Sequence, residues 1–184
     1  MIREFSSFKH IFAIDPGLEA TGWAVLSEST GRLLACGVAR PFARVNQTQT
    51  IADIRLKILK IWEEQVGFSK QPRILAIEMP QIYQQKFLKG DPNDLIPLSV
   101  MGGLLWASLT PKTCYLPKPQ SWKGQVPKNT MQERIFGAMD LASKKVLAEG
   151  LHIIPKYLRH NTYDAIGIGQ WAFRKFQGEA NDAK

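Results

Sequence analysis

The sequence predicts an α/β fold in which a mixed five-stranded sheet, an antiparallel meander extended by parallel strands, is flanked by helices. Three features of the pattern support this prediction. Three short strand-like runs follow one another near the N-terminus, and helical and strand-like segments alternate after them. One unbroken apolar run in the middle of the chain is typical of a strand that is buried on both faces.

The meander is expected at residues 11–14, 21–26 and 33–38, because turn residues such as Asp15-Pro16-Gly17 separate these apolar runs. A helix should follow over residues 49–65, where apolar side chains recur at helical spacing. We expect this helix to pack against the sheet.

The middle of the chain extends the sheet. Residues 73–78 contain Ile74-Leu75-Ala76-Ile77, which predicts a central strand, and a second central strand is expected at residues 113–116. Residues 95–109 between them are apolar and include Met101-Gly102-Gly103, the pattern of a helix in close contact with another element.

The last third is mostly helical. Residues 117–127 combine Pro, Lys, Gln, Ser, Trp and Gly, which predicts an irregular basic loop. Helices are expected at residues 129–136 and 140–148 and near residues 160–176. The length suits one core, so we predict a single domain over residues 1–177 and a polar tail over residues 178–184.

The composition is that of an ordinary soluble globular protein, with 45% hydrophobic and 22% charged residues. No run resembles a signal peptide or approaches the roughly 20 apolar residues of a membrane span, so we expect an intracellular, cytoplasmic protein. Cys36 and Cys114 have neither the number nor the spacing of a disulfide framework or zinc site, which favours reduced thiols.

The net charge of +8 and the pI near 9.6 favour an anionic partner. Nucleic acid is the leading candidate, because a surplus of Lys and Arg attracts a polyanion and releases its counterions on binding. Many basic proteins bind nothing acidic, however, so charge alone does not decide the partner.

Three acidic residues lie at positions that favour a functional site. Asp15 and Glu78 each follow an apolar strand directly, which places them at the carboxyl ends of core strands, where α/β folds bind ligands. Asp15 is alternatively a turn former, whereas a carboxylate at Glu78 is costly to desolvate without a cation. Asp164 lies among small and apolar residues that let a helix approach the sheet, or it is a first-turn acid stabilised by the helix dipole.

His160 and Asn161 lie four and three residues before Asp164, so either can share its helical face and act as a fourth ligand. Converging carboxylates repel one another unless divalent cations neutralise them, and oxygen ligands suit Mg²⁺ or Mn²⁺. Two such ions can activate water for phosphodiester hydrolysis. No organic cofactor is expected.

Three motifs together resemble the RuvC-type Holliday junction resolvases, which have an RNase H-like fold. Residues 11–17 with 21–25 resemble the first hairpin of this family, Leu75-Ala76-Ile77-Glu78 resembles its fourth strand with the catalytic glutamate, and residues 164–168 resemble its last helix. The motifs occur in the family's order and span nearly the whole chain. The length between Glu78 and Met101, the residue Asn161 and the Trp122-Lys123-Gly124 loop resemble bacteriophage relatives more than cellular enzymes.

The resemblance implies a metal-dependent, structure-specific DNA endonuclease that acts in recombination and repair. It implies a homodimer whose two active sites nick opposed strands of a four-way junction, with two Mg²⁺ ions per site or Mn²⁺ in their place. Such an enzyme works in the cytoplasm of a bacterial cell, or of the host if the source is viral. Asp15, Glu78 and Asp164 are the implied metal ligands; where the family has Asp or His, this chain has Asn161, with His160 as a possible substitute.

The resemblance also implies residues that hold DNA. Lys128 stands where the family places a lysine at the start of the next helix, and Lys123 lies in the loop before it. Tyr83 or Phe87 could be an aromatic wedge, with Lys86 and Lys89 beside it, although both rings also suit a core. Trp122 is more often a core anchor than a base stacker.

Other functions remain open at this point. An actin-like ATPase shares the Asp-x-Gly hairpin but needs a second lobe, for which 184 residues leave no room. An RNase H-like nuclease that acts on ribosomal RNA precursors shares the fold, although Glu78 argues against it. A catalytically weak protein that binds branched DNA is the alternative from another class, since a neutral Asn161 supplies less charge to a second metal ion.

Overall fold

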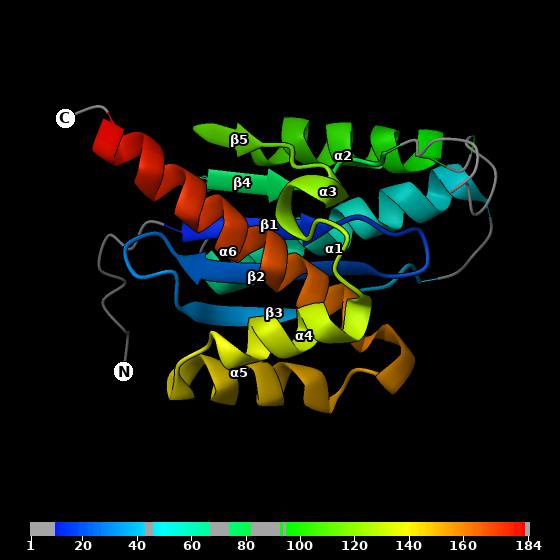
Figure 1. Ribbon diagram of the computed structural model, residues 1–184. Helices are drawn as coiled ribbons and strands as arrows, with labels where there is room; N and C mark the ends of the chain where they lie inside the picture. Colours follow the sequence, from blue (N-terminus) through cyan, green and yellow to red (C-terminus); the bar gives the residue numbers. More distant parts are fainter. Residues whose placement is uncertain (1–9, 43–45, 67–73, 82–92, 94, 183–184) are drawn as a thin grey trace, which may run out of the picture.

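The computed structural model describes residues 10–42, 46–66, 74–81, 93 and 95–182. Five strands form one mixed sheet in the order β3-β2-β1-β4-β5 (Figure 1). The strands are β1 (His10–Asp15), β2 (Thr21–Ser27), β3 (Leu33–Ala39), β4 (Ile74–Ile77) and β5 (Thr113–Tyr115). The first three pair antiparallel, whereas β4 is parallel to β1 and β5 is parallel to β4. The predicted meander extended by parallel strands is therefore confirmed.

The central strands are apolar because both of their faces are covered. Side chains alternate between the two faces of a strand, so Ile11 and Ala13 of β1 join one core cluster while Phe12 and Ile14 join the other. All residues of β4 are fully buried. An unbroken apolar run is the sequence that this position requires.

Helices cover both faces of the sheet (Figure 1). Helix α6 (Arg159–Asp182) crosses one face, where α4 (Lys128–Gly137) packs beside it and α5 (Leu141–His152) packs against β3. Helices α1 (Gln47–Val66) and α2 (Leu95–Leu109) pack together over the other face. A one-turn helix, η3 (Lys156–Leu158), leads into α6. The sheet thus lies between two helical layers.

Three expectations about single elements need correction. Strand β5 was expected to be central, but it pairs only with β4 among the described strands and its residues are half-buried, as suits the mixed sequence Thr-Cys-Tyr. The basic loop contains a helical turn, α3 (Pro119–Trp122), because Pro119 has the backbone angle that a first helical position requires. Helix α6 continues past Gly178 to Asp182, and the Tyr115 hydroxyl donates to Glu179 at 2.5 Å, which ties this last turn to β5.

Both cysteines are free thiols, as expected. Burial raises the pKa of Cys36 to about 12 and that of Cys114 to about 11, so neither is a ready thiolate. Among the described helices, none is long and apolar enough to cross a membrane.

Candidate active site

The sheet register places Asp15 beside Glu78. Strands β1 and β4 are parallel with Ile14 opposite Ile77, and the Glu78 backbone N–H donates to the Ile14 carbonyl at 3.0 Å. The next residue of each strand is the acid, and both acids leave the sheet at the same edge. The N–H of Met79 donates to the Pro117 carbonyl at 2.9 Å, so the backbone after Glu78 is also fixed.

A close approach of α6 brings Asp164 to the same edge. Gly22 of β2 lies opposite Asp15, and a Cβ placed on Gly22 would lie 1.9 Å from the Asn161 carbonyl oxygen. Only a glycine lets the start of α6 press so closely against β2. The Thr162 hydroxyl donates to the Gly37 carbonyl at 3.3 Å and secures this contact. Asp164 follows less than one helical turn later.

The charges of the three acids affect one another. Burial raises the pKa of Asp15 well above its usual value, and the nearby charges of Glu78 and Asp164 raise it further, against the opposing effect of Lys123 and Lys128. Burial likewise raises the pKa of Glu78 and of Asp164. The positive charges of the two lysines therefore only partly offset the rise in pKa that burial and mutual repulsion cause in the three carboxyl groups.

A consequence for stability can be measured. The folded pKa of Asp15 is raised above its unfolded value of about 3.9, so its favourable contribution is complete below that value and is lost as the pH rises through the folded pKa. When a chelator keeps divalent cations from the site, Asp15→Asn should therefore raise the free energy of unfolding at pH 7 by about 1–2 kcal/mol. Urea unfolding between pH 5 and pH 8 should show a shallower loss of stability in the variant; parallel curves would contradict the burial of this charge.

A cavity of about 350 Å³ opens between these elements. Asp15, Asp164, His160, Asn161, Lys123 and Lys128 line it, together with Pro16, Val126 and Met131. Six of the predicted site residues thus meet at one cavity. Burial and the charge of Lys128 lower the pKa of His160, which favours a neutral imidazole with a free nitrogen.

Glu78 lies at the side of this cavity rather than in its lining. Its Oε2 atom accepts a hydrogen bond from the Trp122 indole and lies 3.9 Å from the Lys123 ammonium. Sequence reasoning assigned Trp122 to the core and Lys123 to DNA and missed both contacts. The available signal was that a buried indole N–H needs an acceptor.

The donor set is suited to a hard divalent cation, because carboxylate and amide oxygens dominate it. In the described part of the chain, no three His, Cys, Asp or Glu side chains are already gathered as a metal cage. The carboxylate of Glu78 is held by its contacts with Trp122 and Lys123. The predicted DNA contacts Tyr83, Lys86, Phe87 and Lys89 lie outside the described residues.

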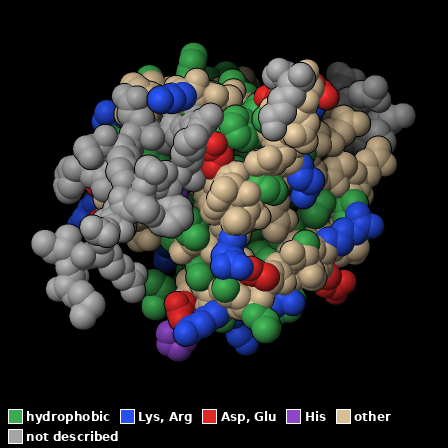
Figure 2. All heavy atoms as spheres, turned by 90° about the vertical axis from the view of Figure 1, so that its left-hand side faces the viewer, with side chains coloured by type: hydrophobic (Ala, Val, Ile, Leu, Met, Phe, Trp, Pro, Cys, Tyr) green, Lys and Arg blue, Asp and Glu red, His purple; other side chains and the backbone are tan. Residues whose placement is uncertain are grey.

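The opposite end of the sheet has a different character. Figure 2 shows that end, where the described basic, acidic and hydrophobic side chains are interspersed and no sign of charge dominates.

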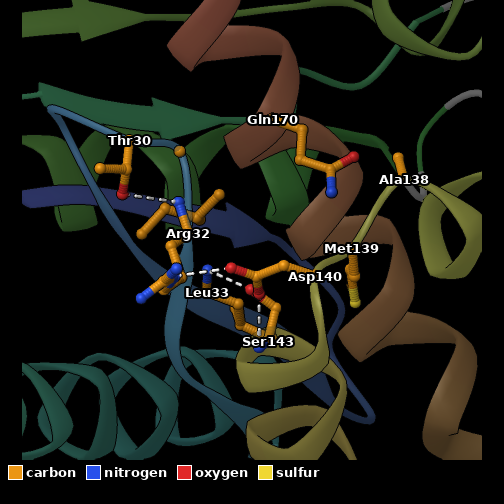
Figure 3. Close-up of a pocket in the computed structure, with 10 residues that line it drawn as sticks. Thr30, Arg32, Leu33, Ala138, Met139, Asp140, Ser143 and Gln170 are labelled. Atoms are coloured by element: carbon orange, nitrogen blue, oxygen red, sulfur yellow. Dashed lines mark hydrogen bonds and ion pairs between the residues drawn. The ribbon is translucent and has the colours of Figure 1, made fainter.

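A second cavity, of about 200 Å³, is structural (Figure 3). The Arg32 guanidinium donates to Asp140 at 2.7 Å, and the Ser143 N–H donates to the other oxygen of Asp140 at 2.8 Å. The Leu33 N–H donates to the Ser143 hydroxyl at 3.1 Å. These groups satisfy one another and join the turn before β3 to the start of α5.

The sequence matches no protein-family model and no curated protein. Among solved structures, RuvC from Thermus thermophilus is similar, with a TM-score of 0.59 and 18% identity over 92% of this chain and 96% of that chain. T. thermophilus RuvC in complex with a Holliday junction substrate gives a TM-score of 0.61, also with 18% identity and coverage of 92% and 96%. The yeast mitochondrial Holliday junction resolvase Ydc2 gives 0.49, with 11% identity over 99% of this chain and 89% of that chain. The chain therefore has the RNase H-like fold of RuvC.

Proposed function

We propose that this protein is a metal-dependent, structure-specific DNA endonuclease that resolves four-way junctions. The observation that supports it most is the meeting of Asp15, Glu78 and Asp164 at one sheet edge, on the fold of a protein whose structure was solved with a Holliday junction. Cleavage of a phosphodiester needs negative charge to hold a cation and positive charge to hold the phosphate, and this edge has both. We propose the cytoplasm as its location.

Mg²⁺ is the proposed cofactor, with two ions per site and Mn²⁺ as a substitute. Asp15, Glu78 and Asp164 would hold the ions, and Asn161 or His160, which both line the cavity, would complete the ligand set. When bound, the metal supplies activation of water and stabilisation of charge on the phosphate. The cost of three partly buried carboxylates, expressed in their raised pKa values, is the feature that favours a cation here.

Lys123 and Lys128 are proposed to hold the scissile phosphate. Both line the cavity, and Lys128 is the first residue of α4, where the helix dipole also favours an anion. A flexible ammonium can follow the phosphate as a point charge. Binding would then depend on the basic groups and cleavage on the acids.

A homodimer formed through α2 is proposed, because cutting opposed strands requires two sites. Helix α2 has apolar residues on all sides. Its outward apolar side chains are exposed, because no described element covers them. These are Ile96, Val100, Leu104 and Trp106, with exposed fractions of 60%, 49%, 42% and 52%. An apolar patch of this kind marks an interface, and a second copy of the chain presents the same patch.

One gel tests the proposal. Four-way, flap and linear duplex DNA are incubated side by side with the protein in Mg²⁺ and in Mn²⁺, and paired nicks are expected in opposed strands of the four-way junction alone. Binding of the junction without cleavage in either metal would instead support a branched-DNA-binding protein, the alternative that the neutral Asn161 favours. Structured RNA is the fourth substrate on the same gel, and its preferential cleavage would replace the resolvase with an RNA-processing nuclease.

The fourth ligand gives a separate prediction. Asn161→Asp adds a charged oxygen at the cavity, so it should hold or raise the cleavage rate and lower the Mg²⁺ concentration needed for half-maximal activity. Titration of Mg²⁺ in the cleavage assay measures this concentration. His160→Ala is the matched variant at the rival position. If His160→Ala changes the Mg²⁺ requirement and Asn161→Asp does not, His160 is the ligand.

A further inference from the structure

Trp122 contacts both the Glu78 carboxylate and the Lys123 ammonium beside it. Its indole N–H donates to Glu78 Oε2, and its ring lies 4.8 Å from the Lys123 ammonium. Trp122 is only 8% exposed, and its hydrogen bond with Glu78 is partly buried. The indole therefore occupies the space between the apolar core and the acidic edge of the sheet.

The indole is held by elements on both sides. Its own turn, α3, follows Pro117, whose carbonyl accepts the N–H of Met79, so the turn is tied to the backbone next to Glu78. On the other side, a Cβ placed on Gly167 would lie 2.5 Å from Cζ3 of the indole. Gly167 thus opens a slot in α6 that admits the ring. The slot lies three residues after Asp164, on the helix that carries this acid.

The physical consequence concerns the freedom of Glu78. A glutamate side chain rotates about several bonds, and a carboxylate at a buried edge could turn in several directions. The indole is rigid, and a hydrogen bond to an ionised acceptor is about twice as strong as a neutral one. Because the indole N–H is bound to Oε2, it limits the directions in which the Glu78 carboxylate can turn. Lys123, by contrast, is a flexible partner that a cation can displace.

We propose that Trp122 is a positioning residue that orients the Glu78 carboxylate for metal binding and sets its place relative to Asp164. This inference rests on the proposed function, since it assigns a role within the same site. This role differs from a packing role, because it depends on the hydrogen bond from the indole N–H to Glu78 and not on the volume of the ring. Partners that orient metal ligands typically contribute about 10–100-fold to metal affinity.

The test measures Mn²⁺ affinity of the full-length protein without DNA, by calorimetry and by electron paramagnetic resonance of free Mn²⁺. Trp122→Phe removes the donor and keeps an aromatic ring, and we expect it to weaken Mn²⁺ binding about 10-fold or more. Gly167→Ala keeps the donor but pushes the ring from its slot, and it should weaken binding in the same direction. Junction affinity should stay within about twofold in both variants, because the basic surface is intact.

Trp171→Phe is the matched control. Trp171 packs against the same core cluster and makes an edge contact with Tyr115, at 5.9 Å between ring centroids. It should change thermal stability as the Trp122 variant does and leave Mn²⁺ affinity unchanged. In a Glu78→Ala background, Trp122→Phe should have no further effect on Mn²⁺ affinity, because the coupled group is gone.

The outcomes separate this inference from the proposed function. Equal Mn²⁺ affinity in Trp122→Phe and wild type would make Trp122 a packing residue only, and tighter binding would mean that its hydrogen bond holds Glu78 away from the metal; either overturns the inference and leaves the nuclease standing. If Trp122→Phe fails to fold, Gly167→Ala gives the same readout. Wild-type protein that binds no Mn²⁺ would overturn the inference and the proposed metal site together.

Discussion

Asp15→Asn, Glu78→Gln and Asp164→Asn are each expected to reduce cleavage of a four-way junction by about 10²–10³-fold or more, since each removes a carboxylate proposed to hold the cations that stabilise charge at the reacting phosphate. The affinity for junction DNA should remain nearly unchanged. The acids repel the phosphate backbone and contribute nothing favourable to binding without metal, whereas the lysines that attract the backbone are untouched. Single-turnover cleavage and gel-shift titration measure the two quantities separately.

Glu64→Gln is the control for these variants. It makes the same change of charge on an exposed acid of α1, which pairs only loosely with Lys60 at 3.8 Å and lies outside the cavity lining. Its cleavage rate should match that of wild type. Retained cleavage in any of the three acid variants would remove that residue from the site, and parallel loss of binding and cleavage would mean that the substitution had disturbed the fold.

Much of this fold follows from the sequence because a few strong patterns carry it. Ile74-Leu75-Ala76-Ile77 is apolar on both faces, which is typical of a strand in the middle of a covered sheet. Once that strand pairs in parallel with β1, the acids after each strand must leave at the same edge. The helix that carries Asp164 was also predictable, since its small residues permit a close approach to the sheet.

The contacts of Glu78 did not follow from the sequence. Trp122 and Lys123 lie 44 and 45 residues from it, in a segment whose turn-forming composition predicts a loop and not the path of that loop. The indole reaches Glu78 only because Gly167 leaves room in α6, and such a three-way fit depends on tertiary packing. The edge position of β5 escaped prediction for a similar reason, since a strand of three residues carries too little pattern to distinguish centre from edge.

The two glycines of α2 were equivalent in the sequence, and the structure separates them. Gly102 is buried, and a Cβ there would lie 3.7 Å from Ile77 and 3.9 Å from Met79, so a charged residue would disturb the core. Gly103 is exposed with no heavy atom within 4 Å of a Cβ position. It lies beside Leu104 on the apolar surface of α2 and is therefore the position at which to test the proposed dimer.

Gly103→Glu is expected to give a folded monomer that no longer cuts junctions symmetrically. A charge buried without a partner in an apolar interface costs several kcal/mol, which would weaken the dimer by about 10²-fold or more. The monomer itself should gain slightly in stability, because Glu favours a helix over Gly by roughly 0.5–1 kcal/mol. Light scattering measures the mass, and end-labelling of two opposed strands shows whether the nicks remain paired.

Gly178→Glu provides the matched control, since Gly178 is also a helical glycine with open space around it but lies on α6. It should leave mass and paired nicking unchanged. Because each subunit keeps its own acids and lysines, the Gly103→Glu monomer should still make single nicks, so loss of pairing with retained nicking distinguishes a broken interface from a broken site. Wild-type protein that stays monomeric both free and on junction DNA would exclude the dimer and leave a nuclease that nicks one strand at a time.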